Sequence, residues 1–177
     1  WAVGYDSLAL PVAAGVFVMT GLVRVYWLFA GNQFERLPAL FPVRKRDWVN
    51  LVTQVKYYLM IHPERAPHYI GHNPLQQLSY TTTYVVSIVV TLTGFAMYGQ
   101  AAPGGFFYTI TQPLTLAVGG IQVVRLVHHL CVWWFIIFPL MHIYLVIRKE
   151  VTERGGGLSG IVNGGHYIRA DKQYVDE

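Results

Sequence analysis

The sequence predicts an all-α protein, a bundle of up-and-down helices embedded in a membrane. The chain has 177 residues, of which 54% are hydrophobic and only 12% are charged, so it is too apolar for an ordinary soluble domain of this size. Several segments hold the about 20 apolar residues that are needed to cross roughly 30 Å of hydrocarbon. The basic residues lie in short clusters between these segments rather than on one continuous face, which argues against nucleic acid as a partner and for membrane lipid.

Three segments meet the length required of a membrane-spanning helix. The first is expected at about 8–30 and carries one charge, Arg24. The second, at about 75–98, has no charge but many hydroxyl side chains, which can bond back to their own helix or across to a neighbouring helix. The third, at about 126–147, is apolar apart from three histidines. These spans and their connections form a predicted membrane bundle over residues 1–150.

The charges between the spans predict how the chain crosses the membrane. The connection 31–74 has an excess of basic residues, which the positive-inside rule places in the cytoplasm. Within it, residues 48–61 mix apolar and aromatic side chains with a lysine and predict a helix lying on the membrane surface. The uncharged connection 99–124 is rich in Gly and Pro and is expected to be an outer loop.

The two ends of the chain complete this topology. Arg148 and Lys149 place the end of the third span in the cytoplasm, where the polar segment 151–177 forms a tail. The sequence opens at Trp1 without an initiator methionine. We therefore expect a longer chain, in which a fourth span upstream completes a four-helix bundle.

The histidines of the third span are the candidates for chemistry, because ionisable residues inside a membrane usually face a cavity, a cofactor or a partner. His128 and His142 are separated by about 21 Å along a helix and return to within about 40° of the same face. Imidazole nitrogen is an axial ligand of haem iron, so this spacing predicts haem sites at two depths of the bilayer. The alternative is that these histidines only hydrogen-bond a neighbouring helix. His129 points about 100° away and is expected to contact a propionate, a partner chain or a hydroxyl.

Other polar residues have weaker predicted roles. Arg24, Arg125 and Arg148 lie near the ends of spans, where they either pair with haem propionates or extend toward lipid headgroups. Asn73 before Pro74 is typical of a helix N-cap. Alternatively, His72 and Asn73 bind a quinone headgroup at the cytoplasmic membrane face. The spans contain no nucleotide-binding loop, nucleophile triad or paired carboxylates, so we expect no catalytic residue of hydrolytic or phosphoryl chemistry.

Several motifs in order resemble the nickel-iron hydrogenase b-type cytochrome subunit, which is related to formate dehydrogenase gamma subunits. The motifs are the stretch Arg24–Asn32, Gly71-His72-Asn73-Pro74, the stretch Thr93–Gly99, the stretch His142–Arg148 and Val162-Asn163-Gly164. The resemblance implies four membrane helices, two b haems, and electron transfer from a partner's iron-sulfur clusters to membrane quinone. It also implies a prokaryotic inner membrane, with the iron-sulfur small subunit and the nickel-iron large subunit on its outer face. A higher oligomer of that complex is left open.

The resemblance also implies the haem ligands. His128 matches the outer-side ligand of the last helix and His142 the inner-side ligand. The second inner-side ligand belongs to a first helix that this sequence does not contain. The second outer-side ligand falls on Leu10, which cannot bind iron. The outer haem is therefore absent, five-coordinate, bound by His129 or completed by another chain, so one or two haems are expected.

Two alternatives to this function remain at the level of the sequence. In the first, the partner is formate dehydrogenase or another periplasmic oxidoreductase, although the Gly71–Pro74 motif favours hydrogenase. In the second, the chain is a membrane anchor without redox activity, in which the histidines only pack. The haem content of the protein separates a cytochrome from a membrane anchor without redox activity.

Overall fold

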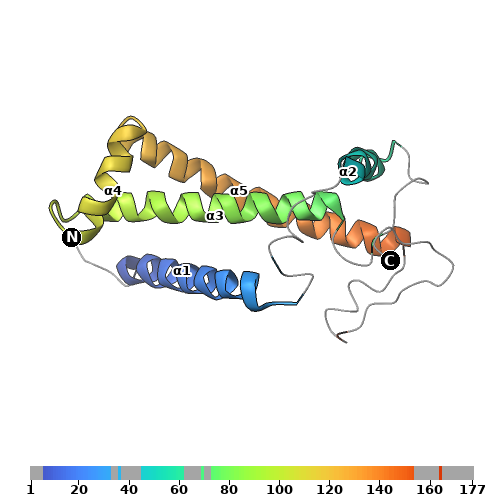
Figure 1. Cartoon of the computed structure of the whole chain (residues 1–177), viewed down its shortest axis with the longest axis horizontal. Helices are drawn as coiled ribbons and strands as arrows, with labels where there is room; N and C mark the ends of the chain where they lie inside the picture. Colours follow the sequence, from blue (N-terminus) through green and yellow to red (C-terminus); the bar gives the residue numbers. More distant parts are fainter. Residues whose placement is uncertain are drawn as a thin grey trace.

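The computed structural model describes residues 6–32, 36, 45–61, 69, 73–153 and 164, and the regular structure in this part of the chain is entirely helical. The helices are α1 (Asp6–Ala30), α2 (Lys45–Tyr58), α3 (Pro74–Gly99), α4 (Phe106–Ala117) and α5 (Ile121–Glu153) (Figure 1). Three segments are long and apolar enough to cross a membrane, namely Leu8–Ala30, Pro74–Gly99 and Ile121–Val151. The prediction of an all-α membrane bundle is confirmed. Most of the predicted tail 151–177 lies outside the described residues.

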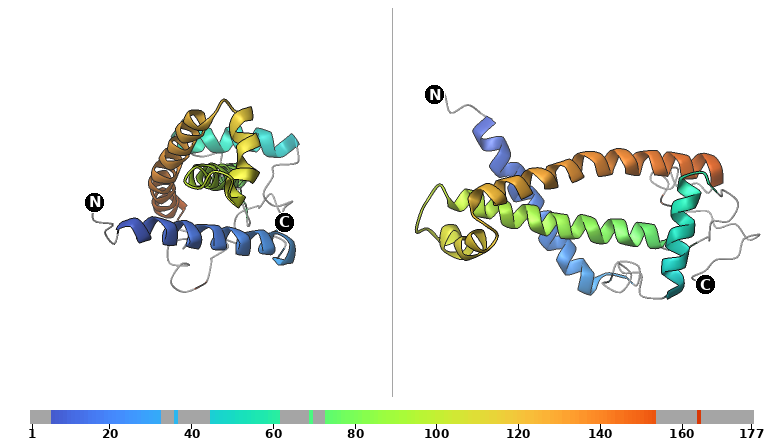
Figure 2. Two further views of the ribbon diagram at one scale, coloured as in Figure 1. Left: turned by 90° about the vertical axis from the view of Figure 1, so that its left-hand side faces the viewer. Right: turned by 90° about the horizontal axis from the view of Figure 1, so that it is seen from above.

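The centre of the fold is the antiparallel pair α3 and α5, which lie side by side in all views (Figures 1 and 2). Hydroxyl side chains of α3 bond back to carbonyls one turn earlier, as Thr83 does to the Ser79 carbonyl at 2.9 Å. The same Thr83 oxygen also accepts the indole N–H of Trp134 on α5, at 3.3 Å. These hydroxyl groups of α3 are therefore satisfied within their own helix or across to α5, as an apolar surrounding requires.

The start of α3 is defined by Asn73 and Pro74. The Asn73 side-chain oxygen accepts the Gln76 backbone N–H at 2.8 Å, and the Gln76 side-chain oxygen accepts the Asn73 N–H at 3.0 Å. This capping box satisfies backbone donors that have no partner within the helix. Pro74 occupies the first turn, where its missing N–H costs nothing. The N-cap predicted from the sequence is confirmed.

The connection between α3 and α5 contains a helix, α4, which the expectation of an outer loop over 99–124 did not include, and its location on the outer side stays a prediction. Gly105 begins the helix in extended conformation and Val118 ends it. Helix α4 continues through Pro113, although proline removes one helical hydrogen bond. Packing on α3 compensates, since the Phe95 and Phe107 rings stack with centroids 5.0 Å apart. After α4, Gly119 and Gly120 have φ of 102° and 94° and turn the chain into α5.

Gly99 controls how closely α4 approaches α3, and its substitution by alanine should destabilise the protein. A Cβ at this position would lie 2.8 Å from the Tyr108 nitrogen and 3.0 Å from the Phe107 carbonyl carbon. These are backbone atoms, so α4 itself would have to move. We expect Gly99→Ala to lower the free energy of unfolding by about 1–3 kcal/mol, measured by chemical unfolding in detergent with circular dichroism.

Gly15→Ala is the matched control, because a Cβ there has no neighbour within 4 Å. On helix propensity alone, it should leave the free energy of unfolding unchanged or raise it by up to about 1 kcal/mol. If Gly99→Ala were as stable as the control, the close contact between α3 and α4 would not contribute to stability.

Helix α1 crosses α3 and α5 obliquely (Figure 2). It meets α5 where the Phe17 and Phe135 rings pack edge to face with centroids 5.7 Å apart. It meets α3 where the Arg24 Nε donates to the Tyr84 hydroxyl at 2.6 Å. The charge of Arg24 is thus placed against α3.

Helix α2 lies across the end of the α3–α5 pair at which α3 begins and α5 ends (Figure 2). It covers 45–58 rather than the expected 48–61, and the chain leaves the helix at Met60, which has a φ of 62°. Arg148 of α5 holds it there, because one guanidinium nitrogen donates to the Tyr57 carbonyl at 2.8 Å. The guanidinium carbon also lies 5.1 Å from the Tyr57 ring centroid and 5.7 Å from the Tyr58 ring centroid. The location of α2 on the membrane surface stays a prediction.

Candidate functional site

His128 lies half-buried on α5, facing the second half of α3. Its Nδ1 is 2.9 Å from the Thr93 hydroxyl oxygen, a polar contact between α5 and α3. The neighbouring residue, Gly94, has no side chain, and a Cβ added there would lie 3.5 Å from His128 Cε1. The Nδ1 edge of the ring is therefore engaged by α3, whereas Nε2, on the other side of Cε1, is left as the nitrogen for a ligand.

His142 lies further along α5, and its side chain is exposed on the surface of the described helices. Its ring stacks on Phe138 with centroids 5.9 Å apart, and Phe138 stacks on Trp134 with centroids 5.4 Å apart. These residues are four apart in sequence, so they form one column along α5. The column limits the orientations of the His142 imidazole through residues of its own helix.

His129 is exposed and its Nδ1 is 2.9 Å from the Arg125 carbonyl oxygen of the preceding helical turn. Because a carbonyl oxygen can only accept a hydrogen bond, this ring nitrogen carries the proton. The bond holds His129 to its own helix, unlike the bond from His128 to α3. Arg125 is also exposed, and its predicted contact to a propionate stays a prediction.

The other two arginines predicted to contact propionates have protein partners. Besides its hydrogen bond to Tyr84, Arg24 stacks over the Tyr84 ring with its guanidinium carbon 5.2 Å from the centroid. Arg148 is bound to α2 through Tyr57 and Tyr58. These contacts show how each charge is stabilised at the edge of an apolar region. A role of either arginine toward a propionate stays a prediction.

Asn73, a predicted quinone contact, and Leu10, at the expected position of a haem ligand, are both described by the structure. Asn73 is 5% exposed, and its side-chain oxygen caps α3. His72 lies outside the described residues, so the proposed quinone contact stays a prediction. Leu10 is 76% exposed on α1 and presents only hydrocarbon, which suits contact with lipid chains.

The donor set suits a prosthetic group that brings most of its own ligands. Among the described residues, no group of three or more His, Cys, Asp or Glu side chains could hold a metal ion directly. Haem needs only one or two ligands from protein, and the imidazole of a histidine is a common one. The residues present therefore fit haem better than a directly bound metal ion.

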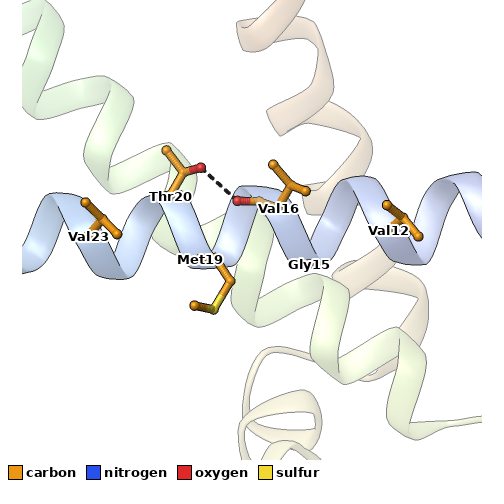
Figure 3. Close-up of a pocket in the computed structure, with 6 residues that line it drawn as sticks. All are labelled: Val12, Gly15, Val16, Met19, Thr20 and Val23. Carbon is orange, nitrogen blue, oxygen red and sulfur yellow. Dashed lines mark hydrogen bonds between the residues drawn. The ribbon is translucent and has the colours of Figure 1, made fainter.

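A shallow groove on α1 offers no comparable chemistry (Figure 3). Its lining residues all come from α1 and are Val12, Gly15, Val16, Met19, Thr20 and Val23. The only polar side chain among them, Thr20, donates its hydroxyl to the Val16 carbonyl at 2.8 Å within the helix. The groove is an apolar surface suited to lipid chains or another helix.

The site contains two residues that the sequence did not single out, Thr93 and Gly94. The sequence indicated that hydroxyls of this span bond within or between helices, and the Thr93–Gly99 stretch was part of a motif. It did not indicate which hydroxyl meets which histidine. That pairing depends on the register between α3 and α5.

Comparison with known proteins places the chain in a family. The family described as prokaryotic cytochrome b561 matches residues 9–164. The "Probable Ni/Fe-hydrogenase B-type cytochrome subunit" of Azotobacter vinelandii is 36% identical over 97% of this chain and 72% of its own length. The protein of that name from Azotobacter chroococcum mcd 1 is 35% identical with the same coverage.

A more distant relative is the "Probable Ni/Fe-hydrogenase 1 B-type cytochrome subunit" of Escherichia coli strain K12, which is 30% identical over 91% of this chain and 70% of its own length. No solved structure matches the chain. The family match covers every described helix from α2 to α5 and nearly all of α1. This multi-pass membrane protein therefore belongs to the prokaryotic cytochrome b561 family.

Proposed function

We propose that the chain is the membrane-anchoring b-type cytochrome subunit of a respiratory uptake nickel-iron hydrogenase and links that enzyme to membrane quinone. The observation that carries the proposal is a half-buried histidine, His128, inside a candidate membrane span, with Nδ1 engaged by Thr93. A histidine held in this way in an apolar helix pair is a preorganised ligand, because its other nitrogen is left for a metal.

Haem b, when bound, supplies a one-electron redox centre within the membrane. In this proposal His128 and His142 would hold haem, and the helical rise of α5 places these two residues about 21 Å apart along its axis. The Trp134–Phe138–His142 column limits the orientations of the second ring. Hydrocarbon around the apolar side chains near both positions would exclude water, which favours electron transfer over side reactions with solvent.

The identity of the partner rests on the relatives. Each of the proteins described above carries a name that makes it a Ni/Fe-hydrogenase subunit. By analogy, the partners of this chain are the iron-sulfur small subunit and the nickel-iron large subunit, on the outer face of a prokaryotic inner membrane. The acceptor is a quinone, with His72 and Asn73 as its proposed contacts.

The haem content of the purified complex tests the proposal. A pyridine haemochrome assay should give at least one haem b for each copy of the chain. One haem would mean that the outer site, which has Leu10 at the expected ligand position, is lost. Two would mean that another group replaces that ligand. No haem would leave only a membrane anchor and would overturn the proposal.

The partner and the acceptor are tested on the same sample. Hydrogen should reduce the haem, seen as sharpening of its visible absorbance bands, and added quinone should reoxidise it. A haem that dithionite reduces but hydrogen does not would contradict a hydrogenase partner. A haem that hydrogen reduces but quinone leaves reduced would contradict the acceptor.

A further inference from the structure

We infer that Thr93 is a positioning residue that holds His128 in the tautomer protonated at Nδ1, so that the lone pair of Nε2 is available to iron. The inference rests on the proposed function, because it concerns the way in which this chain prepares a haem ligand. It goes further by naming a residue on another helix that determines the state of the ligand.

The argument begins with the single proton of the Thr93 hydroxyl. Its oxygen lies 2.7 Å from the Val89 carbonyl oxygen and 3.1 Å from the Val90 carbonyl oxygen. Carbonyl oxygens only accept hydrogen bonds, so the hydroxyl proton must point toward them. Were it to point elsewhere, two oxygens would face each other at 2.7 Å without a proton between them, which is unfavourable in an apolar surrounding.

The proton between Thr93 and His128 must therefore come from the imidazole. The Thr93 oxygen has already donated its proton and meets His128 Nδ1 at 2.9 Å with a lone pair. Nδ1 is the donor in this contact and carries the proton, which leaves Nε2 unprotonated in the neutral ring. Only the unprotonated nitrogen of a neutral imidazole binds iron, so Thr93 selects the nitrogen that can act as a ligand.

The surroundings of the pair favour this role over simple packing. Gly94 follows Thr93, and the ring carbon next to Nε2, Cε1, faces the space that a larger side chain would occupy. The Thr93 hydroxyl also withdraws the Nδ1 proton slightly, which raises the basicity of Nε2. A more basic ligand stabilises ferric over ferrous iron, so Thr93 is expected to hold the potential of the haem bound to His128 lower than it would otherwise be.

Thr83 provides a matched control on the same helix. Its hydroxyl also bonds back one turn, to Ser79, and also accepts an N–H from a ring of α5. That ring is the indole of Trp134, which has no lone pair on nitrogen to give to a metal. Thr83→Val removes an equivalent hydroxyl without changing a histidine, so it reports the effect of lost helix–helix bonding alone.

The experiment compares Thr93→Val, Thr93→Ser and Thr83→Val in the complete complex. Valine keeps the branched shape of threonine and lacks the hydroxyl, whereas serine keeps the hydroxyl. We expect Thr93→Val to bind its haem about 10- to 100-fold more weakly in competition with apomyoglobin. We also expect it to raise the midpoint potential of that haem in a redox titration. Thr93→Ser and Thr83→Val should match the unmutated complex in both measurements.

Each outcome decides the inference. An unchanged affinity and potential in Thr93→Val, in a complex that holds haem at His128, would overturn the role of Thr93 and leave the proposed function intact. Equal effects of Thr83→Val and Thr93→Val would reduce the role to helix packing and also overturn it. An unmutated complex without haem would instead overturn the proposed function. A complex that keeps all of its haem in His128→Ala holds no haem at that residue, which would overturn the role of Thr93 and leave the proposed function intact. If Thr93→Val does not assemble, Thr93→Ala removes the same hydroxyl without added bulk and takes its place.

Discussion

Replacing His142 by alanine should remove the inner haem and stop hydrogen-driven quinone reduction. The substitution takes away the only inner-side ligand that this sequence is expected to supply, and a methyl group cannot bind iron. Haem content should fall by about one equivalent per chain, measured by the pyridine haemochrome assay. Quinone reduction by hydrogen should fall to the background rate, whereas hydrogen oxidation with an artificial acceptor should be unchanged, because the proposed function assigns that chemistry to the partner subunits.

Met141→Ala is the control for His142→Ala, since Met141 precedes His142 on α5 and is 52% exposed. About 100° of helix rotation separates the two side chains, so the control changes the same region of the helix without touching the imidazole. It should keep both the haem and quinone reduction. Quinone reduction that survived in His142→Ala would show that electrons reach quinone by a route that avoids this residue.

Replacing His128 by alanine should have the second largest effect, and comparison with His129→Ala identifies the outer ligand. His128 is half-buried and bonded across to α3, whereas His129 is exposed and bonded to its own helix. If the protein holds an outer haem, His128→Ala should lose about one equivalent of haem, and His129→Ala should keep it. The readouts are haem content and the low-temperature absorbance spectrum, which separates haems with different ligands.

The opposite pattern of haem loss in these two variants would contradict the role of His128 as the outer ligand. Loss of haem in His129→Ala alone would mean that His129, rather than His128, is the outer ligand on α5 and that the Thr93 bond serves only packing. A complex with one haem that neither substitution removes would show that the outer site does not exist. In that case His128 would be a helix-packing residue.

The spans could be predicted from the sequence because their signal is local. A run of apolar residues of sufficient length is a property of each segment, and α1, α3 and α5 coincide closely with the expected positions. The same is true of the N-cap, where Asn73 and Pro74 act on the helix that follows them directly. For α5, the helix extends beyond the expected span at both ends, since length in hydrocarbon does not determine where a helix stops in water.

Helix α4 could not be predicted in the same way. Its sequence holds Pro113, which disfavours a helix interior, and it lies between glycines that indicate turns. The contacts that stabilise it come from α3, through Phe95 and the bare backbone of Gly99. Tertiary packing overrides local propensity here, and a sequence taken segment by segment does not contain that information.

The candidate site could be predicted only in part from the sequence, because some of its contacts join different helices. Spacing along one helix indicates that His128 and His142 share a face, but it cannot identify Thr93 as the partner of His128. That requires the relative height of α3 and α5, which the sequence does not state. Likewise, the sequence predicts contacts of the arginines at span ends with haem propionates or lipid headgroups, but it could not identify Tyr84 and Tyr57, the partners of Arg24 and Arg148 on other helices.

The bonds of Thr83 to Trp134 and of Thr93 to His128 also limit the mechanics of the membrane domain. They join α3 to α5 at two different depths, so translation of one helix along the other would break both at once. Membrane proteins that transmit signals by sliding helices need an interface free to shift by small steps. These two bonds instead fix the position of α3 relative to α5. A fixed helix pair keeps electron-tunnelling distances constant. It also disfavours sliding of one helix along the other as a way for a partner on one face of the membrane to influence the other face.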